Sequence, residues 1–297
     1  MSTSFRTTIL IIGVLLVQAV GACVPQRLVA QPSAAPTPEP PSGTFARVTM
    51  PDTEVRQLKS SETGRSYDIY IRLPDQYAQE KGKKYPILYV LDGQWDFKLL
   101  DSIQSGLLYD KFVPEMIIVG ITYSGDRPDY GALRAMDYTP VHDTFIPGSG
   151  EAPKFFAFLK ERLLPFIESN YRTDASQRVL LGSSFGGTFT LYTLFSEPTL
   201  FSRYIIGSPI VTYGDRFALQ QEADYARMHK DLPVRLFLSV GGLEEMTRPV
   251  QAFMQVLRER NYTGLDMETR IIEGERHAGN KPEAYHRGLR FIFQDDE

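Results

Sequence analysis

The stretch Val179-Leu180-Leu181-Gly182-Ser183-Ser184-Phe185-Gly186-Gly187-Thr188 predicts the feature around which this chain folds. An apolar run of strand character leads into it, and residues 189–195 leave it at helical spacing. Within it, Gly182-x-Ser184-x-Gly186 is typical of a nucleophile elbow, a turn so tight that only glycines fit beside the serine. Such a turn lifts the Ser184 hydroxyl off the sheet edge and places the Phe185 amide beside it at a helix N-terminus. The alternative is an ordinary Gly/Ser-rich turn without chemistry.

Composition bounds the class of protein. The chain has 297 residues, of which 42% are hydrophobic and 23% charged, as in a globular protein with a full core. A formal net charge of -4 gives no electrostatic reason to expect nucleic acid as a partner. One cysteine and four histidines exclude a disulfide framework or a Cys/His zinc cluster within one chain. We expect no metal or organic cofactor.

The N-terminal segment reads as targeting sequence rather than fold. The apolar run 9–20 is too short to span a bilayer comfortably and ends in Val20-Gly21-Ala22-Cys23. This end resembles a bacterial lipobox, so we expect a signal peptide over 1–22 and lipidation of Cys23, with ordinary secretory cleavage near Ala22 as the alternative. Residues 23–43, rich in Pro, Ala, Ser and Thr, predict an extended tether. The catalytic domain would occupy 44–297 and face an extracytoplasmic space, such as the periplasm, anchored to a membrane by lipid.

Beyond residue 44 the pattern alternates between strands and helices. Strands are predicted at 47–58, 66–73, 85–91, 116–121, 178–181, 204–207, 234–240 and 267–272. Helices are predicted at 95–109, 155–171, 215–230, 248–260 and 282–293, besides the one after the elbow, with Pro165 kinking or splitting the second. Residues 123–150 have many turn residues and no clear period. This order predicts an α/β fold with about eight mostly parallel strands, an antiparallel start and helices on both faces.

Candidate partners for Ser184 follow from the chain order Ser, acid, His that α/β-hydrolases use. His277 sits in a loop just beyond the last predicted strand, where an imidazole can reach the serine over the sheet edge. Glu244 follows a long apolar strand across a Gly-Gly turn and is the preferred acid, with Asp215 as the alternative. The loop after the third strand would supply a second oxyanion donor, for which the Gln94 amide is best placed.

Taken together, these motifs resemble a known family. The chain carries Leu91-Asp92-Gly93, the serine elbow, Ser208-Pro209, Val240-Gly241-x-x-Glu244 and Glu275-x-His277. The combination resembles the "Putative esterase" (esterase D-like) family of α/β-hydrolases, most of all its siderophore-esterase branch, over about residues 67–293. The resemblance implies an α/β-hydrolase fold and hydrolysis of a small carboxylic ester by Ser184, Glu244 and His277. The oxyanion loop of this chain resembles that of mycolyltransferases of the same superfamily, which supports Gln94 and Phe185 as the donors.

Three alternatives to ester hydrolysis by a triad remain open from the sequence. Some siderophore esterases are described as using a Ser–His dyad, which puts the role of Glu244 in question. An acyltransferase would share the same acyl-enzyme, and a non-catalytic lipoprotein could keep the fold as a binding module. A complete Ser/Glu/His set argues against the latter.

The irregular segment 123–150 should border the pocket, because ligands bind at the carboxyl ends of such strands. It carries tyrosines and arginines, whose rings and guanidinium groups suit aromatic or oxygen-rich acyl groups. Arg134-x-x-Asp137-Tyr138 resembles a segment near the pocket of siderophore esterases. We therefore expect Arg134 and Tyr138 to contact the substrate, against the alternative that this is a surface loop.

Overall fold

A computed structural model of the chain describes residues 48–294. The chain divides into two units, residues 1–48 and 49–297, and the sheet and helices belong to the second unit. The predicted signal peptide, the tether and Cys23 lie outside the described residues. In the part that is described, no helix is long and apolar enough to cross a membrane.

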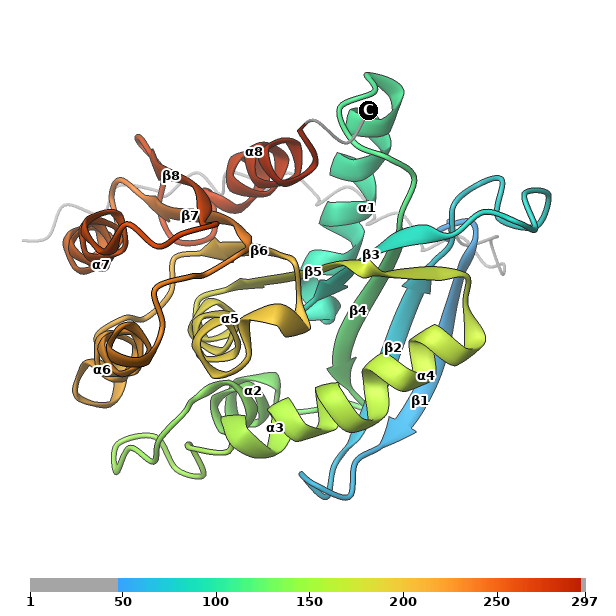
Figure 1. The fold of residues 1–297 in the computed structure, drawn as a ribbon. Helices are drawn as coiled ribbons and strands as arrows, with labels where there is room; N and C mark the ends of the chain where they lie inside the picture. The colour runs from blue at the N-terminus through green and yellow to red at the C-terminus, as the bar shows by residue number, and fades with distance from the viewer. Residues whose placement is uncertain (1–47, 295–297) are drawn as a thin grey trace, which may run out of the picture. The chain divides into compact units, whose positions relative to one another are not determined.

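An eight-stranded sheet forms the centre of the fold (Figure 1). Its strands lie in the order β1-β2-β4-β3-β5-β6-β7-β8. Their bounds are Thr53–Lys59, Ser66–Arg72, Tyr85–Val90, Ile117–Tyr123, Thr173–Ser183, Arg203–Gly207, Arg235–Gly241 and Asp266–Ile272 for β1 to β8. The pairs β1–β2 and β2–β4 are antiparallel and all others are parallel. The predicted sheet with an antiparallel start is therefore confirmed.

Helices cover both faces of this sheet (Figure 1). Helices α1 (Gly93–Tyr109) and α8 (Lys281–Phe293) pack on one face, with Phe97, Leu100 and Leu289 in their shared core. The other face carries α5 (Phe185–Ser196), α6 (Tyr213–Met228) and α7 (Thr247–Arg260), among others. Strands β3 and β4 are buried along their whole length, which explains why their sequences are continuously apolar.

The helical run after residue 150 is split, as Pro165 predicted. It consists of α3 (Ala152–Phe158), a π-helical turn (Leu159–Leu163) and α4 (Leu164–Asn170). Proline has no N–H and its ring collides with the preceding turn, so an unbroken α-helix cannot pass through this position. Figure 1 shows that α3 and α4 nevertheless continue in nearly the same direction across the π turn.

Helix α2 (Tyr130–Tyr138) is a difference from the sequence prediction, which left this segment without regular structure. The carboxylate of Asp129 caps its N-terminus by accepting a hydrogen bond from Ala132 N at 3.0 Å. The helix has only nine residues, and its buried positions include the charged Asp137. A buried charge interrupts the apolar periodicity by which a short helix would be found in the sequence.

The loop between α2 and α3, which we call the 139–151 loop, closes on itself. Thr139 Oγ1 accepts a hydrogen bond from Gly150 N at 2.7 Å, and Thr139 O accepts one from Ala152 N at 3.0 Å. Near the start of the loop, Val141 O accepts a hydrogen bond from the Tyr213 hydroxyl at 2.9 Å. Tyr213 begins α6, and α6 follows the carboxyl end of β6. The contact with Tyr213 therefore places this part of the loop near the carboxyl edge of the sheet.

Candidate active site

Ser184 occupies a strained turn between β5 and α5. Its backbone has φ 62° and ψ -126°, a combination that residues other than glycine rarely adopt. Its amide donates a hydrogen bond to Gly207 O on β6 at 2.9 Å, which fixes the turn to the neighbouring strand. A Cβ atom on Gly182 would lie 2.3 Å from Gly186 O, so no larger residue fits there. The predicted nucleophile elbow is present, with half-buried Ser184 at its apex.

The two predicted oxyanion donors lie at the starts of two helices. Phe185 is the first residue of α5 and Gln94 the second of α1. N–H groups in the first turn of a helix have no partner within the helix, so both amides are available to an oxyanion. The Gln94 side chain is held aside, because its Oε1 accepts a hydrogen bond from Thr122 Oγ1 at 2.7 Å. This placement is consistent with the predicted role, which remains a prediction.

Glu244 and His277 are paired. His277 Nδ1 lies 2.6 Å from Glu244 Oε2, and a carboxylate can only accept there, so the ring carries its proton on Nδ1. Burial acts to raise the pKa of Glu244, but hydrogen bonds from His277, Ser208 and the Gly241 amide outweigh it and lower that pKa below its ordinary value. Glu244 is therefore ionised at neutral pH and stabilises positive charge on the imidazole.

Strand order brings the three predicted catalytic residues to one edge of the sheet. Ser184 follows β5, Glu244 follows β7 and His277 follows β8, all at carboxyl ends of parallel strands. Asp215, the alternative acid, is exposed in a left-handed turn at the start of α6, and the carboxylate that meets His277 is that of Glu244. The placement agrees with the predicted roles, which stay predictions.

Two buried residues that the sequence analysis did not assign surround Glu244. Ser208 Oγ donates a hydrogen bond to Glu244 Oε1 at 2.6 Å, and Asn280 Nδ2 donates one to the same oxygen at 2.9 Å. The Ser208-Pro209 motif was part of the family resemblance but carried no assigned role. Asn280 gave no sequence signal, because an asparagine before a helix reads as an ordinary cap.

Arg134 lies beside the site but is already engaged. Its Nε and Nη2 bind the two carboxylate oxygens of buried Asp92 at 2.9 and 2.6 Å. The guanidinium also lies over the rings of Trp95 and Phe185, at 5.6 and 5.4 Å from their centroids. Asp92 precedes Gln94, so this ion pair links α2 to the loop of one predicted oxyanion donor and, through Phe185, to the other. Contact between Arg134 and the substrate stays a prediction.

Tyr138 and Asp137 are structural in this arrangement. The Tyr138 side chain is 1% exposed, and its hydroxyl accepts a hydrogen bond from Asp92 N at 3.3 Å. It offers a bound molecule almost no surface, so its burial speaks against the predicted substrate contact. Asp137 is fully buried, where it binds Arg65 and the Tyr67 hydroxyl. Burial raises the pKa of Asp137 to about 6, although the Arg65 charge opposes the shift.

Aromatic surface is nevertheless available next to the predicted oxyanion donors. Trp95, adjacent to Gln94, is 46% exposed and meets Tyr130 edge-on at a centroid distance of 5.8 Å. Phe185 is half-buried and packs edge-on against Tyr213 at 6.1 Å. A flat acyl group bound at Ser184 would therefore find rings from α1, α2 and α5 within the same region.

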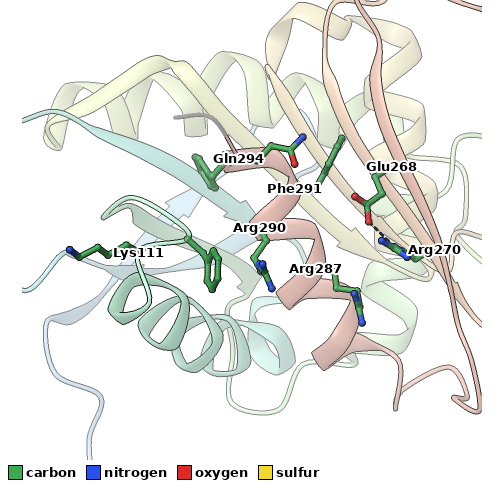
Figure 2. A pocket seen from close by; sticks show the side chains of 9 residues that line it. Lys111, Glu268, Arg270, Arg287, Arg290, Phe291 and Gln294 are labelled. Atoms are coloured by element: carbon green, nitrogen blue, oxygen red, sulfur yellow. Dashed lines mark hydrogen bonds and ion pairs between the residues drawn. The ribbon is translucent and has the colours of Figure 1, made fainter. Parts of the chain in front are cut away.

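A separate cavity of about 400 Å³ lies between the end of α1, β8 and the last turns of α8 (Figure 2). Its lining is mostly cationic, but two of the arginines already have partners. Arg270 Nε donates a hydrogen bond to Glu268 Oε1 at 2.7 Å, and Arg290 Cζ lies 3.8 Å from the centroid of the Phe112 ring. Its lining residues are Lys111, Phe112, Glu268, Arg270, Arg287, Arg290, Phe291, Phe293 and Gln294. None of these is a residue predicted for the chemistry, so the cavity is distinct from the candidate active site.

Residues 48–294 contain no cluster of His, Cys, Asp and Glu that could hold a metal ion.

Comparison with known proteins decides the family. Residues 60–287, more than three quarters of the chain, match the family described as "Putative esterase". The chain belongs to this esterase family. Among curated relatives, it is 30% identical to the ferri-bacillibactin esterase BesA of Bacillus subtilis over 274 residues, which cover 86% of this chain and 94% of the relative.

Solved structures agree with this assignment. The BES protein from Bacillus cereus is 31% identical, with a TM-score of 0.76 over 85% of this chain and 99% of that one. An IroE-like serine hydrolase from Shewanella oneidensis is 25% identical, with a TM-score of 0.74 over 82% of this chain and 81% of that one. The fold is thus an α/β-hydrolase fold, and the chain is a carboxylic ester hydrolase of the siderophore-esterase branch.

Proposed function

We propose that this esterase hydrolyses siderophore-type or other aromatic esters through an acyl-enzyme on Ser184. The observation that carries the proposal is the 2.6 Å contact between His277 Nδ1 and Glu244, at the sheet edge where strained Ser184 emerges. A histidine whose Nδ1 is bound to a carboxylate presents its Nε2 as a base, which is the arrangement that activates a serine.

The mechanism follows from these positions. His277 takes the Ser184 proton as Ser184 Oγ attacks the ester carbonyl, and Glu244 stabilises the imidazolium that forms. The Phe185 and Gln94 amides hold the oxyanion, each contributing about 3–4 kcal/mol to the transition state. His277 then protonates the leaving alcohol. Water, activated by the same histidine, attacks the acyl-enzyme and releases the acid.

The substrate class is supported by relatives and by the surroundings of Ser184. Relatives of this chain carry the names ferri-bacillibactin esterase, apo-salmochelin esterase and siderophore enterobactin esterase. Trp95, Tyr130 and Phe185 give the site aromatic surface that suits a flat acyl group. Arg134 adds a positive charge beside these rings, although Asp92 balances it.

An ester panel with product identification tests this proposal. The full chain is incubated with catecholate siderophore esters, other aromatic esters and straight-chain butyrates, and products are identified by mass spectrometry. We expect free acid and higher kcat/KM for the aromatic esters. Transfer of the acyl group to an added alcohol in place of water would indicate the acyltransferase alternative. No turnover of any ester, with no covalent adduct, would favour the binding-module alternative.

Replacing Arg134 with alanine is expected to destabilise the fold and to lower kcat on all esters, because the Arg134–Asp92 ion pair holds the loop of one predicted oxyanion donor. The change leaves the Asp92 carboxylate buried and unpaired, which costs about 3–5 kcal/mol in comparable buried pairs. Kinetics on aromatic and straight-chain esters, with a denaturant unfolding curve, measure both effects. The matched control is Arg134→Gln combined with Asp92→Asn, which removes both charges and should recover most of the stability. A greater loss on aromatic than on straight-chain esters would support the predicted contact between Arg134 and the substrate, and equal losses would speak against it.

We further propose, from the sequence alone, that Cys23 is lipidated and anchors the enzyme to a bacterial membrane on an extracytoplasmic side. Cys23→Ser removes the residue that would carry the acyl chains, and stable anchoring requires two or more such chains. The variant should therefore move from the membrane to the soluble fraction. Fractionation and mass spectrometry of the mature N-terminus measure this. A native protein that is already soluble, with a mature N-terminus other than Cys23, would indicate plain secretion.

A further inference from the structure

We propose that Ser208 and Asn280 are positioning residues that hold Glu244 in the one orientation and charge state in which it can serve His277. The inference rests on the proposed function of Ser184 and His277 and adds two residues to it. It is carried by the hydrogen bonds around one oxygen atom, Glu244 Oε1, which faces away from the histidine.

Three donors converge on Glu244 Oε1. They are Ser208 Oγ at 2.6 Å, Gly241 N at 2.7 Å and Asn280 Nδ2 at 2.9 Å. The other oxygen, Oε2, is left for His277. Donors that require an acceptor stabilise the ionised carboxylate and oppose its protonation. A carboxylate with one oxygen held from three directions also cannot rotate away from the imidazole.

Ser208 occupies a backbone conformation that serine does not favour. It follows β6 with φ 42°, is fully buried, and donates its amide hydrogen to Ser239 O at 2.8 Å. Glycine would adopt this conformation with less strain. What serine adds over glycine is a hydroxyl donor, and that donor is directed at Glu244. Strain retained in this way is typical of functional sites.

Asn280 links Glu244 to the histidine loop. Its Nδ2 donates to Glu244 Oε1 and also lies 2.8 Å from the main-chain carbonyl of His277. Exchanging Nδ2 and Oδ1 would set oxygen against oxygen at both places, so the orientation of the amide is determined. Oδ1 is buried without a hydrogen-bond partner in the described part of the chain. The two acceptors therefore require the donor end of the amide to face Glu244 and the histidine loop.

Ser208→Gly is the sharpest test, because it removes the hydroxyl while relieving the backbone. We expect kcat/KM to fall about tenfold, through kcat with KM unchanged, and the unfolding midpoint to stay the same or rise. The decisive comparison repeats the substitution in a Glu244→Ala background. If Ser208 acts through Glu244, its effect there should shrink to less than about twofold, since residues acting through one another are not additive.

Asn280→Ala, tested in the same two backgrounds, provides the second variant and should behave in the same way. Proton NMR of the full chain adds a readout that does not need turnover: both substitutions should move the resonance of the His277 Nδ1 proton. Equal losses in the two backgrounds, or full activity and an unmoved resonance in both variants, would overturn the inference. A wild-type enzyme without ester turnover would refute the proposed function instead, and the resonance would still decide the positioning.

Discussion

Ser184→Ala is expected to abolish ester hydrolysis and labelling by a fluorophosphonate probe. The loss in kcat should be on the order of 10⁵-fold or more, because removal of the nucleophile leaves only binding and the oxyanion donors. The substitution removes one half-buried hydroxyl and leaves the elbow backbone to glycines 182 and 186, so the fold should persist. Steady-state kinetics and mass spectrometry of the labelled peptide measure the result.

Ser183→Ala is the matched control for this experiment. Ser183 precedes the nucleophile and is buried, 2% exposed, at the end of β5. Its variant should keep probe labelling on Ser184 and most of the activity. Undiminished hydrolysis by Ser184→Ala, or a probe adduct on another residue, would contradict the acyl-enzyme mechanism while leaving the esterase family assignment intact.

His277→Ala should reduce kcat by a comparable factor, because the serine alcohol is a weak nucleophile without its base. Residues that act as a unit are strongly non-additive, so the double variant Ser184→Ala/His277→Ala should be no slower than either single one. Because the His277 ring is about half exposed, its removal should leave the unfolding midpoint nearly unchanged. Kinetics of the three variants on one aromatic ester are sufficient to measure this.

His142→Ala serves as the control for His277, since His142 precedes Ser184 in the chain and the Glu244 carboxylate meets His277. A change of less than about twofold is expected there. If His142→Ala were as damaging as His277→Ala, or if His277→Ala kept more than a tenth of the wild-type rate, the assignment of the base would be wrong.

Much of the fold could be predicted because the sheet is buried on both faces. Continuous apolar runs such as residues 85–90 have few other structures available, and the elbow glycines restrict the turn that can form between strand and helix. The pairing of Glu244 with His277 could be predicted from the sequence because both residues follow parallel strands, and the carboxyl ends of parallel strands meet at one edge of the sheet. Chain order and strand ends are local properties of the sequence.

The features that could not be predicted depend on contacts between distant segments. An arginine in a turn-rich segment is expected to be available for substrate, yet Asp92, 42 positions away, binds Arg134. Tyr138 is buried for a similar reason, because its hydroxyl accepts a hydrogen bond from the amide of Asp92, 46 positions away. Asn280 was not found because its partner Glu244 is 36 positions away. No local pattern records such pairs.

The self-closed 139–151 loop makes this enzyme a good starting point for engineering substrate range. Its ends are joined through Thr139, and the α2 helix before it is fixed to Asp92 by Arg134. Since the entropy of closing a loop grows only slowly with its length, insertions here cost little stability. A library that varies the loop while retaining Thr139 and Arg134 would sample new walls over the sheet edge without disturbing the groups that are proposed to carry out the chemistry.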